Sequence, residues 1–108
     1  MEKIYNKLVR DNIPKIIESD GEKVIWRVLS SDEYKKALEA KLLEEAHEVI
    51  EALNKGETLE ELADVLEVVE AIALLNDSDL EEVLKLKREK VKKKGGFSKR
   101  LYLQKTIK

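Results

Sequence analysis

Two segments of the chain carry acidic residues at positions where a helix of a soluble protein normally carries apolar ones. At about 100° per residue, Glu45 falls in the middle of an apolar stripe and Glu48 lies about 60° to one side. Further along, Glu61 is central in a second stripe, with Asp64 about 60° off. Ionised carboxylates are not buried without partners, so these four need an explanation. The apolar members of the stripes are Leu38, Leu42, Val49 and Ala52, then Val65, Val68, Ile72 and Leu75.

A short turn is predicted between the two segments. Asn54-Lys55-Gly56 is typical of a helix end, with Gly56 suited to the left-handed conformation of a C-cap. Thr58 then restarts a helix, because Glu61 follows it at the spacing of a capping box. A connection this short predicts two antiparallel helices.

The turn determines which acids face each other. Glu48 and Asp64 each stand eight residues from Gly56, so they are predicted to lie level across the hairpin. Glu45 and Glu61 fall within about one helical turn of that level, roughly 5 Å along the axis. Four converging carboxylates suit a hard cation with oxygen ligands, so we predict a magnesium or manganese site.

Simpler interpretations exist for single residues. Glu61 alone is explained as the capping-box residue, and Lys41 with Glu45 as an ordinary i,i+4 pair. A helix rich in Glu and Lys usually presents a solvated face. Zinc is disfavoured because the chain has no cysteine and His47 points to the outer side. These simpler interpretations do not explain why both acid pairs fall on apolar sides, whereas a metal site does.

The rest of the chain predicts a mainly α single domain over residues 1–108. A short helix over 13–18 is capped by Asp11, and a first long helix runs from a Ser30 or Ser31 cap to about Leu53. A second helix spans about 59–75, and a third, capped by Ser78, ends at the basic run 92–94. The segments 23–29 and 99–107 read as strands. We predict that they form a minor two-stranded β ribbon beside the antiparallel helical hairpin and its third helix.

Composition excludes several functional classes. The net charge of −2 gives no general attraction to nucleic acid or to an anionic membrane surface. No apolar run reaches membrane length and no leader is recognisable, which predicts a cytoplasmic protein. The second helix carries a further apolar flank, which predicts assembly into helical bundles as a homodimer or a dimer of dimers. That flank consists of Leu62, Leu66, Val69 and Ala73.

Three segments carry a resemblance to a known family. EEAHE at 44–48, followed by ELAD at 61–64, resembles the EExxE…ExxD signature of the all-α nucleoside triphosphate pyrophosphohydrolases, the MazG-like superfamily. The opening YNKLVRDNIPKII and the GGFSKRLYL near the end resemble a small single-domain branch related to phosphoribosyl-ATP pyrophosphohydrolase. The resemblance covers nearly the whole chain, and three segments in order are more specific than the acidic motif alone.

The resemblance implies a reaction and roles for residues. It implies magnesium-dependent hydrolysis of a nucleoside triphosphate, including non-canonical ones, to monophosphate and pyrophosphate. Lys41 would neutralise charge on phosphate, and Glu44 would act as an outer carboxylate or a base, although its outward angle argues against direct metal contact. The implied metal ligands are Glu45, Glu48, Glu61 and Asp64, and the implied substrate-binding residues are Lys7, Arg10, Lys41, Lys94 and Arg100.

Two other functions stay open on the sequence alone. The same site could take phosphoribosyl-ATP in histidine biosynthesis. Alternatively, the chain is a non-enzymatic helical oligomerisation or adaptor module, in which the inward acids pair with Lys or Arg across a subunit interface. Lys94 also fits a plain structural role, because a cation complements the dipole at a helix C-terminus.

Overall fold

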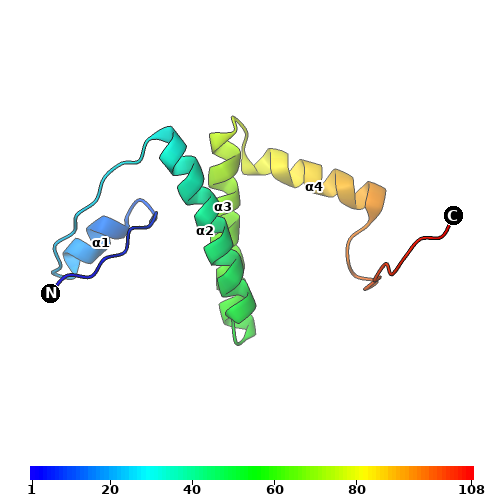
Figure 1. The fold of residues 1–108 in the computed structure, drawn as a ribbon, viewed down its shortest axis with the longest axis horizontal. Coiled ribbons are helices and arrows are strands. Elements are labelled where there is room, and N and C mark those ends of the chain that lie inside the picture. The colour runs from blue at the N-terminus through cyan, green and yellow to red at the C-terminus, as the bar shows by residue number, and fades with distance from the viewer.

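The protein is described by a computed structural model that covers residues 1–108 and consists of four helices without any strand. The predicted β ribbon is therefore wrong. Figure 1 shows the reason: the chain before α2 lies on one side of the central hairpin, whereas α4 carries the C-terminal tail away on the other side. The two segments never meet, and a lone strand has no partner for its backbone groups. The helices are α1 (Ile13–Ser19), α2 (Ser31–Glu51), α3 (Lys55–Leu75) and α4 (Leu80–Lys94).

The first long helix, α2, begins with a capping box at Ser30, one of the two predicted caps. The amide of Glu33 donates to Ser30 Oγ at 3.3 Å, and the Ser30 amide donates to Glu33 Oε1 at 3.1 Å. Arg27 adds two hydrogen bonds to the same carboxylate, at 3.0 and 2.7 Å. The hydrogen bonds from Arg27 and then from Ser30 lower the pKa of Glu33 to about 2. The start of α2 is thus fixed by local chemistry that the sequence displays.

The turn between α2 and α3 differs from the prediction. Asn54 is the N-cap of α3, because its Oδ1 accepts from the Glu57 amide at 2.9 Å. Glu57 in turn accepts from the Leu53 amide through Oε2 at 2.9 Å, which completes a reciprocal cap. Gly56 is consequently inside the helix and not a C-cap, and Thr58 donates its hydroxyl to the Asn54 carbonyl at 2.8 Å. The cap of α3 is therefore Asn54, four residues earlier than the predicted cap at Thr58.

This turn makes a direct prediction for stability. Replacing Asn54 with Ala removes the acceptor for the Glu57 amide, so the free energy of unfolding should fall by about 1 kcal/mol. Replacing Thr58 with Ala should cost less, because its hydroxyl supports a carbonyl that the Thr58 amide already engages. Urea unfolding of the two variants beside the unchanged protein measures both. A larger loss for Thr58→Ala would return the cap to the predicted position.

Smaller corrections apply to the outer helices. Asn12, not Asp11, occupies the N-cap position of α1, and its side chain makes no capping bond. Asp79, not Ser78, caps α4 by accepting from the Glu82 amide at 2.8 Å. A carboxylate there also complements the positive end of the helix dipole. The basic last turn of α4 and the stop at Gly95, with φ of 86°, agree with the sequence.

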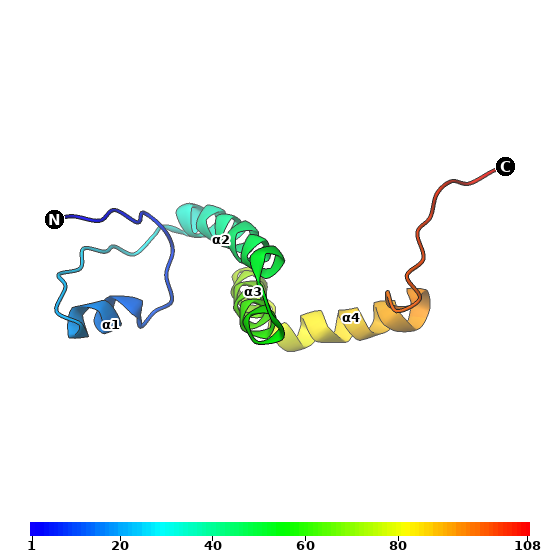
Figure 2. The same cartoon turned by 90° about the horizontal axis from the view of Figure 1, so that it is seen from below.

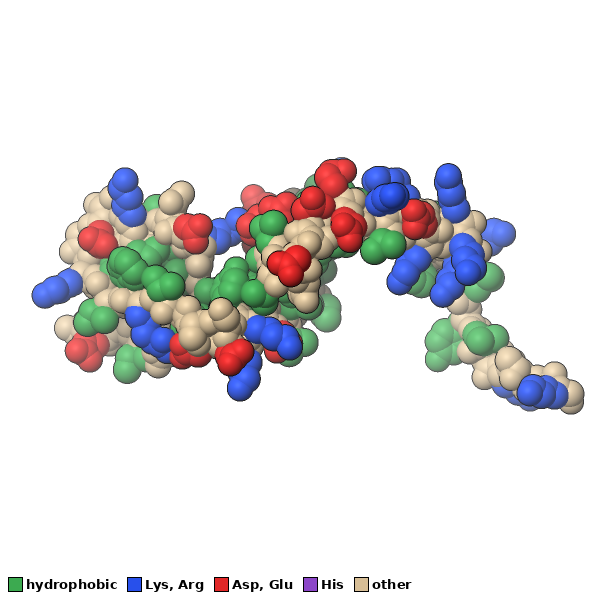
Figure 3. Space-filling model, turned by 90° about the horizontal axis from the view of Figure 1, so that it is seen from above, with side chains coloured by type: hydrophobic (Ala, Val, Ile, Leu, Met, Phe, Trp, Pro, Cys, Tyr) green, Lys and Arg blue, Asp and Glu red, His purple; other side chains and the backbone are tan.

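The chain is extended and has a very small core. Its radius of gyration is 18.5 Å, against about 13 Å for a compact chain of this length. Helices α2 and α3 pack along each other, α4 meets only α3, and α1 packs on no other helix (Figures 1 and 2). Many apolar side chains consequently face solvent, as Figure 3 shows over the N-terminal half. The buried hydrophobic residues are Leu38, Val68 and Ala73.

The charges are segregated along this extended shape. In Figure 3, acidic side chains gather over the hairpin, and basic ones over α4 and the tail. None of the helices combines the length and apolar character that crossing a membrane requires.

Candidate metal centre

Three acids from the two hairpin helices converge at one place. Glu45 comes from α2, and Glu61 and Asp64 come from α3. Each offers a carboxylate oxygen, and these oxygens all lie within 4.8 Å of one another. We call these three residues the acid cluster. Its geometry follows from the turn: Glu45 and Glu61 each stand eight residues from Leu53, at the centre of the connection, so they lie level across the hairpin.

The shifted turn also explains why Glu48 is not level with Asp64 as predicted. With the centre at Leu53 rather than Gly56, Glu48 is nearer the turn and Asp64 is further from it. Glu48 is exposed and remains outside the acid cluster, although it reaches the Glu61 carboxyl. It lines a shallow hollow of about 270 Å³ at the closed end of the hairpin, together with Glu51, Ala52, Glu57 and Glu61.

Burial distinguishes the acid cluster from the many exposed acids of this chain. Glu45 is 7% exposed and is the one charged residue among the buried ones. Its Oε2 atom has no hydrogen-bond partner, and neither has Oε2 of Glu61. A buried, unpaired carboxylate oxygen is costly. Two such atoms on facing helices are what a bound cation would satisfy, and all-oxygen donors fit a hard divalent ion.

The pKa values indicate the same shortage of positive charge. Burial, followed by the charge of Glu48, raises the pKa of Glu45 in spite of the opposing Lys41. A hydrogen bond shared with Glu61, followed by burial, raises the pKa of Glu48. Folding therefore disfavours the ionised forms of both acids. A cation at the acid cluster would remove that penalty.

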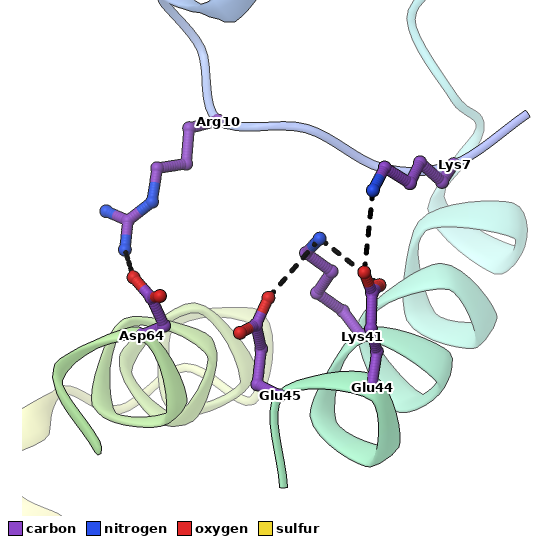
Figure 4. A network of polar contacts seen from close by, with 6 residues as sticks. All are labelled: Lys7, Arg10, Lys41, Glu44, Glu45 and Asp64. Carbon is purple, nitrogen blue, oxygen red and sulfur yellow. Dashed lines mark hydrogen bonds and ion pairs between the residues drawn. The ribbon is translucent and has the colours of Figure 1, made fainter. Parts of the chain in front are cut away.

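Three cationic side chains approach this face of the hairpin (Figure 4). Lys41 Nζ lies 3.2 Å from Glu44 Oε2 and 3.4 Å from Glu45 Oε1. Lys7 Nζ, from the N-terminal segment, lies 3.5 Å from Glu44 Oε1. Arg10 Nη2 donates to Asp64 Oδ1 at 2.7 Å. The N-terminal segment thus crosses the open side of the acid cluster, bound to both hairpin helices.

The ion pairs give Lys41 and Glu44 settled charge states. Burial lowers the pKa of Lys41, but the hydrogen bonds and charges of Glu44 and Glu45 outweigh it, so the net pKa is raised. Burial likewise works against ionised Glu44, but Lys41 and Lys7 outweigh it and lower its pKa. Near neutral pH, Lys41 is accordingly protonated and Glu44 is ionised.

The other predicted residues lie elsewhere in the chain. Lys94 ends α4 and Arg100 lies in the tail beyond it, and α4 leads away from the hairpin (Figure 1). Neither residue pairs with the acid cluster of its own chain. His47 points outward, as expected, and pairs with Glu51 at 2.5 Å. The contact that sequence reasoning missed is the one between Arg10 and Asp64, because 54 residues separate them and no motif spacing marks such a pair.

Comparison with known proteins gives a family and one relative. Residues 33–95, more than half of the chain, match the MazG nucleotide pyrophosphohydrolase domain. A protein of Mycolicibacterium smegmatis (strain ATCC 700084 / mc(2)155), described as uncharacterized, is 46% identical over 54 residues. The matched part is 50% of this chain and 55% of that relative, so the match spans about half the length of each. No solved structure matches the chain.

Proposed function

Because the chain belongs to the MazG nucleotide pyrophosphohydrolase family, we propose that it hydrolyses a nucleoside triphosphate to monophosphate and pyrophosphate, with magnesium as its cation. The observation that supports this most is buried Glu45, which has a free Oε2 and converges with two acids from the opposite helix. The ion pair with Lys41 engages only Oε1 and leaves Oε2 without a partner. The adaptor alternative requires a Lys or Arg of a second subunit at this oxygen.

The hairpin residues divide the work between them. Glu45, Glu61 and Asp64 would hold the cation, with Glu48 as a further carboxylate at the edge of the acid cluster. A bound divalent ion would offset the negative charge of the phosphates and lower the pKa of the attacking water. The protein's own part is to fix these oxygens on two packed helices, so that little has to move when the ion binds.

Lys41 and Glu44 have separate roles in this proposal. Lys41 is protonated and lies beside the acid cluster, where it would stabilise the charge on a phosphate in the transition state. Glu44 is ionised near neutral pH, because Lys41 and Lys7 lower its pKa. It would position the two lysines and, as a carboxylate, accept the proton of the attacking water.

A substrate panel tests the reaction. Nucleoside triphosphates, non-canonical ones included, and phosphoribosyl-ATP are each incubated with the protein and magnesium, and the products are separated. Attack at the α-phosphorus should release pyrophosphate and a monophosphate from one or more of them. Release of orthophosphate and a diphosphate would contradict the proposed reaction. Turnover of phosphoribosyl-ATP alone would favour the role in histidine biosynthesis.

We propose further that the working protein is a homodimer or a dimer of dimers. Only Leu38, Val68 and Ala73 form a buried apolar core, too little for a stable domain of this length. The hairpin leaves large apolar side chains exposed, including Leu43 and Ile50 on α2, Leu53 in the turn, and Leu59, Leu62 and Leu66 on α3. A second hairpin packed on these side chains would build a helical bundle.

Assembly is measured by light scattering over a broad concentration range. The unchanged protein should have the mass of a dimer or tetramer, because the exposed apolar area of the hairpin is larger than a lone subunit tolerates. Replacing Ile50, which is 80% exposed, with Lys should weaken the assembly without removing a core side chain. A monomer at every concentration would refute this proposal.

A further inference from the structure

Arg10 lies where it competes for the acid cluster. Its Nη2 donates to Asp64 Oδ1 at 2.7 Å, the shortest ion pair at this face of the hairpin. Asp64 is one of the three residues whose oxygens converge within 4.8 Å. Figure 4 shows the guanidinium reaching Asp64 from the N-terminal segment, on the far side of the site from Lys7. The chain thus supplies its own cation to an acid of the cluster.

The guanidinium and a divalent ion at the cluster disfavour each other. Both are positive, and both draw on the charge of the same carboxylate. The Arg10 pair is weakly held, because its side chains are 56% and 39% exposed and water screens such pairs. A divalent ion would instead engage several carboxylates, one of them buried with a free oxygen. A divalent ion should therefore bind the acid cluster in preference to the Arg10 guanidinium.

We propose that Arg10 is a tethered counter-ion, which holds Asp64 while no metal is bound and is displaced when a divalent ion enters the acid cluster. This inference rests on the metal site proposed above. Lys7 pairs with Glu44, which is outside the cluster, so this pair survives the exchange and keeps the segment near the site. The released guanidinium is then free to bind a phosphate oxygen pair. Metal entry consequently prepares the site for an anionic substrate, and metal should bind before nucleotide.

The first experiment follows the arginine side chains directly. In a ¹⁵N-labelled sample without nucleotide, magnesium is titrated while the Nε–Hε signals of the arginines are recorded. The Arg10 signal should shift, and its exchange with water should become faster, as the ion pair breaks. Arg27 is an internal control, because its Nη2 makes a similar 2.7 Å ion pair with Glu33 Oε2, and neither residue belongs to the acid cluster. Magnesium should leave its signal unchanged.

The second experiment measures affinity for manganese alone by calorimetry. Arg10→Gln should bind manganese severalfold more tightly than the unchanged protein, because no counter-ion has to be displaced. Arg27→Gln, which also loses one arginine and one ion pair, should bind it like the unchanged protein.

Three outcomes are decisive. If magnesium shifts the backbone amide signals of Glu45 and Asp64 but leaves the Arg10 signal unchanged, the metal binds and the displacement of Arg10 is refuted. Equal or weaker manganese binding by Arg10→Gln would also refute the displacement. If neither the unchanged protein nor Arg10→Gln binds a divalent ion, the metal site fails and the displacement fails with it.

Discussion

Replacing Glu61 with Gln should leave the protein folded and reduce turnover by at least about a hundredfold, the loss typical of removing one group that stabilises the transition state. Glu61 contributes to the acid cluster from α3, and its Oε2 is buried without a partner. The amide of Gln is a poorer ligand for a hard cation than a carboxylate. The capping explanation for Glu61 no longer applies, since Asn54 and Glu57 form the cap of α3.

The variant is assayed at saturating magnesium, and its helix content and unfolding midpoint are measured in parallel. Glu60→Gln is the matched control, because Glu60 is the neighbouring exposed acid on the same helix. It makes the same change of charge and should keep nearly full turnover. Full turnover in Glu61→Gln would remove this residue from the site. Equal losses in both variants would point to the overall charge of the hairpin instead.

The inward direction of the acids was predictable because helical periodicity is a local property. Glu45 falls at the centre of an apolar stripe in the sequence, and the structure buries it to 7% exposure. The antiparallel hairpin followed from a connection of only a few residues. The start of α2 was equally readable, since Ser30 and Glu33 stand at the spacing that their reciprocal hydrogen bonds require.

The register of the hairpin was not predictable to the residue. Gly56 suggests a C-cap, but Asn54 competes as an N-cap and its bond to the Glu57 amide decides the outcome. The turn centre therefore moves from Gly56 to Leu53. That small shift leaves Glu48 outside the acid cluster and brings Glu45 level with Glu61.

Contacts that depend on how distant segments lie in space were beyond the sequence. The segment 23–29 has the β-branched residues of a strand, but strand formation requires a partner, and α4 carries the tail out of reach. The contact between Arg10 and Asp64 is of the same kind, because no local pattern relates residues 54 positions apart. Arg10 was identifiable as a cation near phosphate but not as the partner of a metal ligand.

Replacing Glu45 with Gln should make the protein more stable than the unchanged protein without metal, and less stable than the unchanged protein with magnesium. Burial and the charge of Glu48 raise the pKa of Glu45, so the folded protein binds that proton more tightly than the unfolded chain does. The ionised form therefore costs stability at neutral pH. Gln is neutral and of the same shape, so in EDTA the variant should unfold at a higher urea concentration than the unchanged protein.

Magnesium should act in the opposite direction. An ion that binds only the folded state at a hundredfold excess over its dissociation constant adds about 2.7 kcal/mol to the free energy of unfolding. The unchanged protein should gain on that scale, and Glu45→Gln should gain much less, because the buried carboxylate is gone. Urea unfolding is measured in EDTA and in magnesium at one fixed protein concentration. The midpoint of Glu45→Gln should be above that of the unchanged protein in EDTA and below it in magnesium. Glu39→Gln, an exposed change on the same helix, should follow the unchanged protein in both conditions. Equal gains from magnesium in Glu45→Gln and the unchanged protein would show that Glu45 does not hold the ion.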